Sequence, residues 1–207
     1  MRLRLRRHPG GGRPAVPPER IALEGMVLAR LTADDAVAVS EAVVASLEHL
    51  GPWMPWATPE GTSLEAQRQR LLGPASAWTP GSDYGYGIFG PDGRLVGGIG
   101  LHRRIGRSAL EIGYWVHVDH TRRGIATSAA RALTDTGFAL RGIERMEIHC
   151  DEANLASAAV PRRLGYRLTA RLDHEPEAPG ETGTRLIWVV YRREWEARRR
   201  GPGPERP

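Results

Sequence analysis

The chain of 207 residues contains 41% hydrophobic and 26% charged residues, which is close to average globular usage and excludes disorder over most of its length. Its one cysteine, Cys150, excludes an intrachain disulfide and suits a reducing compartment, the cytoplasm, and no cluster of Cys and His predicts a metal site. No apolar run reaches the length of about 18 residues that predicts a membrane-spanning helix.

The formal net charge of +5 is concentrated at the two ends of the chain. Residues 1–20 contain six Arg and one Glu, and residues 192–207 contain six Arg and three Glu. Both ends are also rich in Gly and Pro, which favours a disordered basic tail at 1–20 and an Arg-rich tail at 192–207, on either side of one domain at 21–191. The arginines therefore do not predict a nucleic-acid-binding face.

The first half of the domain predicts two helices followed by a hairpin. A strand at 26–31 precedes an amphipathic helix that ends at Gly51-Pro52, and a second helix at 63–72 is bracketed by a Ser63 cap and Gly73-Pro74. The turn cluster Gly90-Pro91-Asp92-Gly93 joins strands at 83–89 and 94–101 as an antiparallel hairpin.

The second half predicts a strand-helix-strand crossover, which makes its two strands parallel. The elements are a central apolar strand at 110–118, a helix at 121–140 capped by Gly142, a strand at 145–151, a helix at 154–164 and strands at 166–172 and 185–191. We therefore expect an α/β (α+β) domain with a mixed central sheet of six to seven strands and flanking helices.

The segment Thr121-Arg122-Arg123-Gly124-Ile125-Ala126-Thr127 joins the central strand to the next helix. Free main-chain N–H groups at a helix start favour an anion, and the small residues Gly124 and Ala126 allow it to come close. By itself this pattern is either a phosphate cradle or an ordinary strand-to-helix turn.

Three separate motifs resemble the Gcn5-related N-acetyltransferase (GNAT) superfamily, in its branch of ribosomal-protein-alanine acetyltransferases. They are Glu111-Ile-Gly-Tyr-Trp-Val, the turn at 122–127, and Asn154-x-x-Ser157-x-x-Val160-x-x-x-Leu164-Gly165-Tyr166. The resemblance extends over about residues 21–191 and implies the GNAT fold, in which two parallel strands splay apart. Thr121 departs from the family's signature, which has Gln or Arg at that position.

The resemblance implies that acetyl-CoA is the co-substrate and that its pantetheine arm lies between the strands at 110–118 and 145–151. Main-chain groups of Val116 and Val118 would pair with the pantetheine. The pyrophosphate and the 3′-phosphate would be held by Arg122, Arg123, Gly124, Ile125, Ala126 and Thr127. Asn154 would contact the pantetheine as well as cap a helix, and Ser157 would protonate the departing thiolate.

Aminolysis of a thioester requires a base for the amine and a proton donor for the thiolate, but neither a metal nor a covalent nucleophile. Strand alternation places Glu147 and His149 on one face, and Glu111 lies on the neighbouring strand. The base is therefore Glu111, Glu147 or His149, acting directly or through water, or else these are solvated residues of an exposed face. Cys150 falls on the apolar face, where packing is its expected role.

Trp53, Trp56, Tyr84 and Tyr86 are predicted to line an acceptor pocket, with core packing as the alternative. The expected function is N-acetyl transfer from acetyl-CoA to a primary amine, of a protein N-terminus or a small molecule, by direct attack in a ternary complex. A non-catalytic acyl-CoA-binding regulatory module is the alternative. We expect no nucleic-acid or membrane partner, and a homodimer is left open.

Overall fold

An eight-stranded sheet in the order β1-β2-β3-β4-β5-β6-β8-β7 forms the centre of the protein. The structure is a computed structural model and describes residues 13–73 and 77–200. Only β5 and β6 are parallel; every other neighbouring pair is antiparallel. The strands are β1 (Arg20–Leu23), β2 (Met26–Arg30), β3 (Tyr84–Phe89), β4 (Leu95–His102), β5 (Ala109–Val116), β6 (Arg145–Asp151), β7 (Arg167–Asp173) and β8 (Thr184–Tyr191).

The mixed α/β fold is confirmed, but the sheet has eight strands rather than six to seven. The additional strand is β1, whose four residues follow Pro17 and Pro18 and are too few to produce a clear alternating pattern. Its pairing with β2 forms one edge of the sheet, and β7 forms the other.

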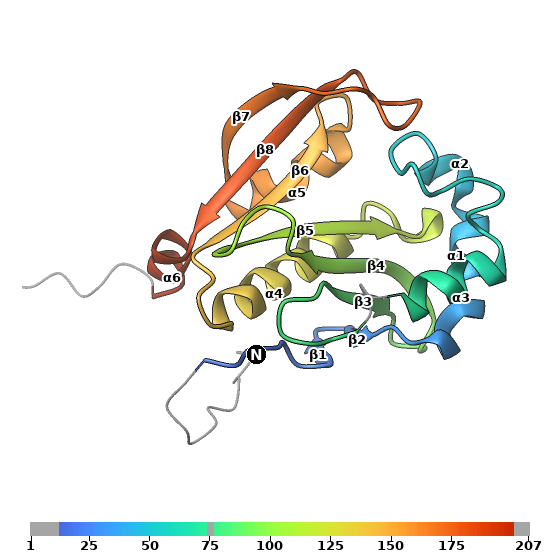
Figure 1. Cartoon of the computed structure of the whole chain (residues 1–207), viewed down its shortest axis with the longest axis horizontal. Coiled ribbons are helices and arrows are strands. Elements are labelled where there is room, and N and C mark those ends of the chain that lie inside the picture. Colours follow the sequence, from blue (N-terminus) through green and yellow to red (C-terminus); the bar gives the residue numbers. More distant parts are fainter. Residues whose placement is uncertain (1–12, 74–76, 201–207) are drawn as a thin grey trace, which may run out of the picture.

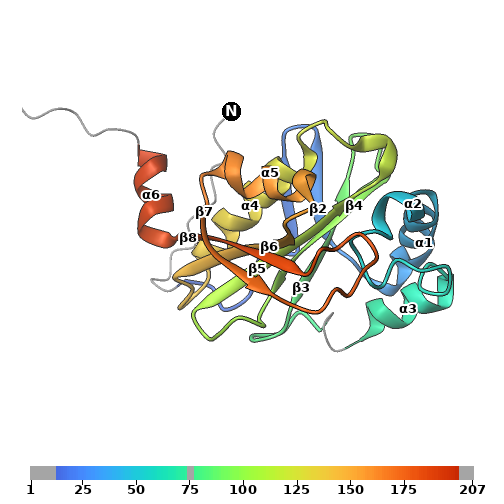
Figure 2. The same ribbon diagram turned by 90° about the horizontal axis from the view of Figure 1, so that it is seen from above.

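Helices cover both faces of the sheet (Figure 1). On β5, Leu110 points to a core that contains Leu133 and Phe138 of α4, whereas Trp115, of opposite parity, joins a second core with Val39 of α1. Figure 2 shows α1 to α3 grouped at one end of the molecule and α6 at the other. The helices are α1 (Ala36–Ala45), α2 (Leu47–Leu50), α3 (Leu64–Leu72), α4 (Ile125–Ala139), α5 (Leu155–Leu164) and α6 (Arg192–Arg200).

Two of the predicted helices differ from those in the structure. The first helix is interrupted at Ser46, a buried residue whose hydroxyl accepts a hydrogen bond from the main chain of Val118 at 3.1 Å. The crossover helix starts at Ile125 rather than Thr121, and its C-cap is Leu140 rather than Gly142. The break at Ser46 depends on its contact with Val118, and the start of α4 depends on the loop before it. Neither could be predicted from the residues of the helix itself.

Both expected tails contribute packed structure to the domain. The main-chain carbonyls of Pro17 and Pro18 accept hydrogen bonds from the buried side chains of Trp78 and Tyr86. At the other end, residues 192–200 form α6, whose Trp195 is buried and donates to Asp135 at 2.7 Å. The ordered domain therefore extends beyond the expected limits of 21–191, while residues 1–12 and 201–207 of the expected tails lie outside the described residues.

In the described part of the chain, no helix is both long and apolar enough to cross a membrane.

Candidate active site

The parallel strands β5 and β6 separate after three paired positions, of which the last is Glu111 with Glu147. β5 nevertheless continues to Val116 and β6 to Asp151, where β6 pairs with β8 on its other side. Figure 1 shows β6 leaving β5 at an angle. Within the described residues, β5 therefore has no strand partner on its β6 side beyond Glu111, and this splay is the feature that the resemblance implied.

Main-chain groups of β5 point into the splay. The N–H group of His117 donates to the carbonyl of Val96 at 2.9 Å, so that pair is hydrogen-bonded across β4 and β5. Hydrogen-bonded pairs alternate in an antiparallel ladder, and Trp115 therefore also bonds to β4. Tyr114 and Val116 direct their main-chain groups the other way, toward the splay. The main chain of Val116 is therefore in a position to bind the pantetheine, and that contact stays a prediction.

The same contact predicted for Val118 is wrong. β5 ends at Val116, and Val118 begins a single 3₁₀ turn at Val118–His120. Its N–H group donates to Ser46 Oγ, and its carbonyl accepts from the hydroxyl of Thr121, each at 3.1 Å. Both polar main-chain groups of Val118 are thus bonded within the protein.

The N-terminus of α4 provides donors for an anion. Gly124 is the N-cap with φ of +78°, a left-handed conformation, and no side chain caps the helix. The N–H groups of residues 125–127 have no acceptor within the helix, and Ser128 is the first to bond, to the carbonyl of Gly124 at 2.9 Å. Arg122, also left-handed with φ of +61°, and Arg123 are exposed beside it. These groups fit a diphosphate.

Ser157 lies in the first turn of α5, on the side of the sheet that α4 covers. Asn154 caps this helix by accepting the Ser157 N–H bond at 3.0 Å, as predicted. The Ser157 hydroxyl lies 3.1 Å from the hydroxyl of Tyr114, whose pKa is raised by burial. Burial also raises the pKa of nearby Cys150 to about 11, so its thiol is protonated at neutral pH.

On the opposite side of the sheet, a charged cluster occupies the point where β5 and β6 part. His149 bridges two carboxylates: its Nε2 lies 2.6 Å from Glu147 Oε2, and its Nδ1 lies 3.6 Å from Glu111 Oε2. Arg104 binds both oxygens of Glu111, at 2.5 and 2.7 Å, and Arg145 Nε lies 2.6 Å from Glu147 Oε1. The three residues named as candidate bases are thus brought together.

Arg104 determines the charge state of Glu111. Burial alone would raise the pKa of Glu111, but the hydrogen bonds from Arg104 and the nearby charge of His149 outweigh burial and lower it. Glu111 is therefore a carboxylate at neutral pH. Because its oxygens are already bonded to Arg104, Glu111 has little capacity to accept another proton.

The four aromatic residues predicted to line an acceptor pocket divide into two pairs. Tyr84 and Tyr86 are fully buried on the α4 side, packed edge-to-face on Trp78, so the prediction is wrong for both. Trp53 and Trp56 are partly exposed, and Trp56 packs on Trp115, on the same side as the charged cluster. A pocket role for Trp53 and Trp56 stays a prediction.

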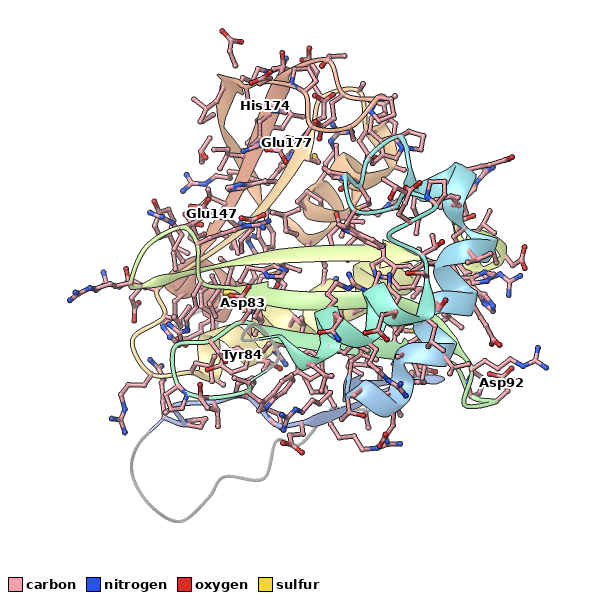
Figure 3. The ribbon with its side chains drawn as sticks, turned by 45° about the vertical axis from the view of Figure 1, so that its right-hand side comes forward. Asp83, Tyr84, Asp92, Glu147, His174 and Glu177 are labelled. Carbon is pink, nitrogen blue, oxygen red and sulfur yellow. The ribbon has the colours of Figure 1, made fainter. Side chains whose placement is uncertain are left out.

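Four further polar residues of this region were not predicted from the sequence: Asp83, His102, Arg104 and Tyr114. His102 pairs with Glu111 in the register of β4 and β5, and His102 Nδ1 lies 2.9 Å from Asp83 Oδ2. In Figure 3, Asp83 and Glu147 lie on either side of the ribbon of β5. The register of the predicted hairpin could have placed Asp83 opposite His102, whereas nothing in the sequence pairs Arg104 with Glu111.

Comparisons with known proteins agree with this geometry. Residues 26–167 match the family described as Acetyltransferase (GNAT) domain. The chain is 28% identical over 178 residues to a protein of Bacillus subtilis (strain 168) named as the ribosomal N-acetyltransferase YdaF, covering 84% of this chain and 94% of the relative.

Solved structures share the fold. RimJ of Mycobacterium smegmatis, solved in complex with CoA-disulfide, superposes with a TM-score of 0.74 at 25% identity, covering 82% of this chain and 83% of that one. The ribosomal-protein-S5-alanine acetyltransferase of Vibrio fischeri gives a TM-score of 0.75 at 18% identity, covering 85% and 98%.

The chain belongs to the GNAT acetyltransferase family. It is an acetyl-CoA-dependent N-acetyltransferase, which transfers the acetyl group to an amine. The splay of β5 from β6 and the uncapped start of α4 fit acetyl-CoA as co-substrate.

Proposed function

We propose that this enzyme acetylates the α-amino group of a protein N-terminus, of the ribosomal-protein kind. The observation that carries the choice of acceptor is the pairing of the carboxylates next to the splay. Glu111 forms an ion pair with Arg104, Glu147 with Arg145, and Asp83 lies beside His102. A polyamine carries several ammonium groups and needs unpaired carboxylates, whereas an N-terminal peptide brings one amine and a neutral main chain.

The relatives support the same acceptor. YdaF, named for ribosomal N-acetyl transfer, aligns over most of both chains, and RimJ shares the fold. An N-terminal α-amino group has a pKa of about 7.7–8.0, so roughly a tenth or more of it is neutral at pH 7 and needs to lose only one proton on the enzyme.

The proposed reaction is direct attack in a ternary complex. The main chain of Tyr114 and Val116 holds the pantetheine, and residues 123–127 with Arg122 hold the phosphates. The amine nitrogen attacks the thioester carbonyl, and Ser157 delivers a proton to the departing sulfur. The cluster of Glu111, Glu147 and His149 fixes the apex of the splay and orients the groups that meet there.

Thiol release from acetyl-CoA over a panel of amines tests this proposal. The panel contains peptides with free N-termini, the same peptides with blocked N-termini, spermidine and free amino acids. We expect turnover of the free peptides alone, with mass spectrometry placing the acetyl group on the α-amine. A higher kcat/KM for spermidine would overturn the acceptor assignment. Binding of acetyl-CoA without release toward any amine would instead support a regulatory module.

A further inference from the structure

We propose that His102, oriented by Asp83, is the general base that removes the proton from the attacking amine. The proposal rests on the proposed function, since it requires an amine acceptor. It concerns a histidine on β4, the strand next to the splayed pair, and not the cluster on β5 and β6 described above.

The sheet makes room for the ring of His102 at two glycines. A Cβ atom added at Gly100 or at Gly113 would lie 3.1 Å from His102 Nε2, which is closer than ordinary van der Waals contact. Gly113 lies on β5, two residues past the last residue paired with β6. The imidazole therefore lies over Gly100 and Gly113, and reaches from β4 onto β5 close to the position where the splay begins.

Asp83 fixes which nitrogen of His102 accepts a proton. The Asp83 side chain lies 2.9 Å from His102 Nδ1, and its other oxygen accepts from the main chain of Arg103 at 2.9 Å. The hydrogen bond from His102 lowers the pKa of Asp83, despite the opposing effect of burial. An ionised carboxylate only accepts hydrogen bonds, so Nδ1 carries the proton and Nε2 of the neutral ring has a free lone pair.

The alternative bases are less suited to the role. Both nitrogens of His149 already face carboxylates, so neither is open to a substrate amine, and Glu111 is bonded through both oxygens to Arg104. The side chain of His102 is 28% exposed, so a proton that it takes up can pass to solvent. Histidine is the most frequent general base in enzymes because it exchanges its proton near neutral pH.

The proton count closes over one cycle. The amine lone pair forms the N–C bond, the C–S bond breaks, and the electron pair stays on sulfur. His102 Nε2 takes one proton from nitrogen, and Ser157 gives one to sulfur; solvent then removes the first and replaces the second. The charged groups that interact with His102 are Asp83 and Glu111 on β5, and Arg104, in the loop after β4, acts on both of these carboxylates.

The test compares His102→Gln with His149→Gln, using His49→Gln on the exposed surface of α2 as control. We expect His102→Gln to lower kcat by about 10²- to 10⁴-fold at neutral pH, with unchanged calorimetric affinity for acetyl-CoA. The loss should shrink as pH rises, because hydroxide then removes the proton from nitrogen in place of His102. Added imidazole should restore part of the rate to His102→Ala, which a purely structural role would not produce.

Asp83→Asn should give a smaller loss of kcat than His102→Gln and leave the KM for acetyl-CoA unchanged. If His102→Gln keeps the wild-type rate and pH profile, or if His149→Gln alone shows the loss and its recovery at high pH, the proposal is overturned while the proposed function stands. If the wild-type enzyme acetylates no amine, both are overturned.

Discussion

The hydroxyl group of Tyr114 donates a hydrogen bond to the main-chain carbonyl of Ser157 at 2.9 Å and lies 3.1 Å from Ser157 Oγ. A tyrosine hydroxyl has one proton to donate, and here it is donated to the carbonyl of Ser157. The Ser157 hydroxyl is therefore the donor in the second contact. Tyr114, on β5, thus holds the proposed proton donor of α5 next to the splay.

Ser157→Ala should lower kcat by about 10- to 1,000-fold, within the range of a lost general acid, with little change in affinity for acetyl-CoA. The loss should be smallest at low pH, where solvent can protonate the sulfur. Tyr114→Phe should reduce kcat less, because Ser157 is still present but no longer oriented. Tyr191→Phe, at an exposed end of β8, is the control. A wild-type rate for Ser157→Ala at every pH would leave water as the donor.

Gly124→Val should weaken CoA binding by about tenfold or more, roughly 1.4 kcal/mol, because a branched side chain enters the space next to the free N–H groups of α4. Gly142→Val is a matched control: its φ of +76° equals that of Gly124 within two degrees, and nothing lies within 4 Å of a Cβ at either position. Both variants carry the same backbone strain of roughly 1–2 kcal/mol. Equal calorimetric affinities for CoA in the two variants would contradict a phosphate site at Gly124.

Asn154→Ala should destabilise the protein by about 1 kcal/mol through the loss of the α5 cap. It should also raise the KM for acetyl-CoA, if Asn154 contacts the pantetheine as proposed. Asn154→Ser keeps a capping oxygen but shortens the side chain, so it should recover the stability and not the KM. Denaturant unfolding measures the change in stability, and initial rates measure the change in KM. A normal KM in both variants would show that Asn154 acts only as the cap of α5.

Arg104→Gln should destabilise the protein most at neutral pH and progressively less in acid. The pKa of Glu111 is lowered in the folded protein, so its ion pair contributes stability above the usual glutamate range and loses it as pH falls through the lowered value. The difference in unfolding free energy between wild type and variant should therefore narrow between pH 7 and pH 3. Arg94→Gln, which breaks an exposed pair with Asp92, should show no such trend.

Truncation after Arg200 should leave stability unchanged, whereas truncation after Tyr191 should cost about 3 kcal/mol or more or prevent folding. The second truncation removes the buried side chains of Trp195 and Arg192. The Arg192 guanidinium donates to the main-chain carbonyls of Phe138 and Ile143. The melting temperatures of the two truncated proteins are compared by thermal unfolding. Equal melting temperatures would show that α6 does not stabilise the domain.

Local sequence patterns predicted the elements that their own residues stabilise. The bounds of β6 at 145–151 agree with the alternation of its side chains, and Asn154 and Ser63 cap the helices that follow them. The turn at 90–93 joins β3 and β4 as predicted. Alternation also separated Glu147 and His149 from Cys150, because successive residues of a strand point to opposite faces.

The assembly of the site depended on contacts between distant segments, which no local pattern reports. Tyr84 and Tyr86 lie on the same face of β3, as two residues that line a pocket would. Their burial depends on Trp78 and the N-terminal segment, which pack against them in the folded protein. Arg192 looks in the sequence like part of a solvated tail, because the carbonyls that it binds, of Phe138 in α4 and Ile143 after it, are far away along the chain. Asp83 and His102 are 19 residues apart and meet through strand register, while Gly100 and Gly113 leave room for the ring. Sequence thus determined seven of the eight described strands, the Ser63 and Asn154 caps and the family. Tertiary structure decided which polar groups meet, since such contacts depend on how whole elements pack.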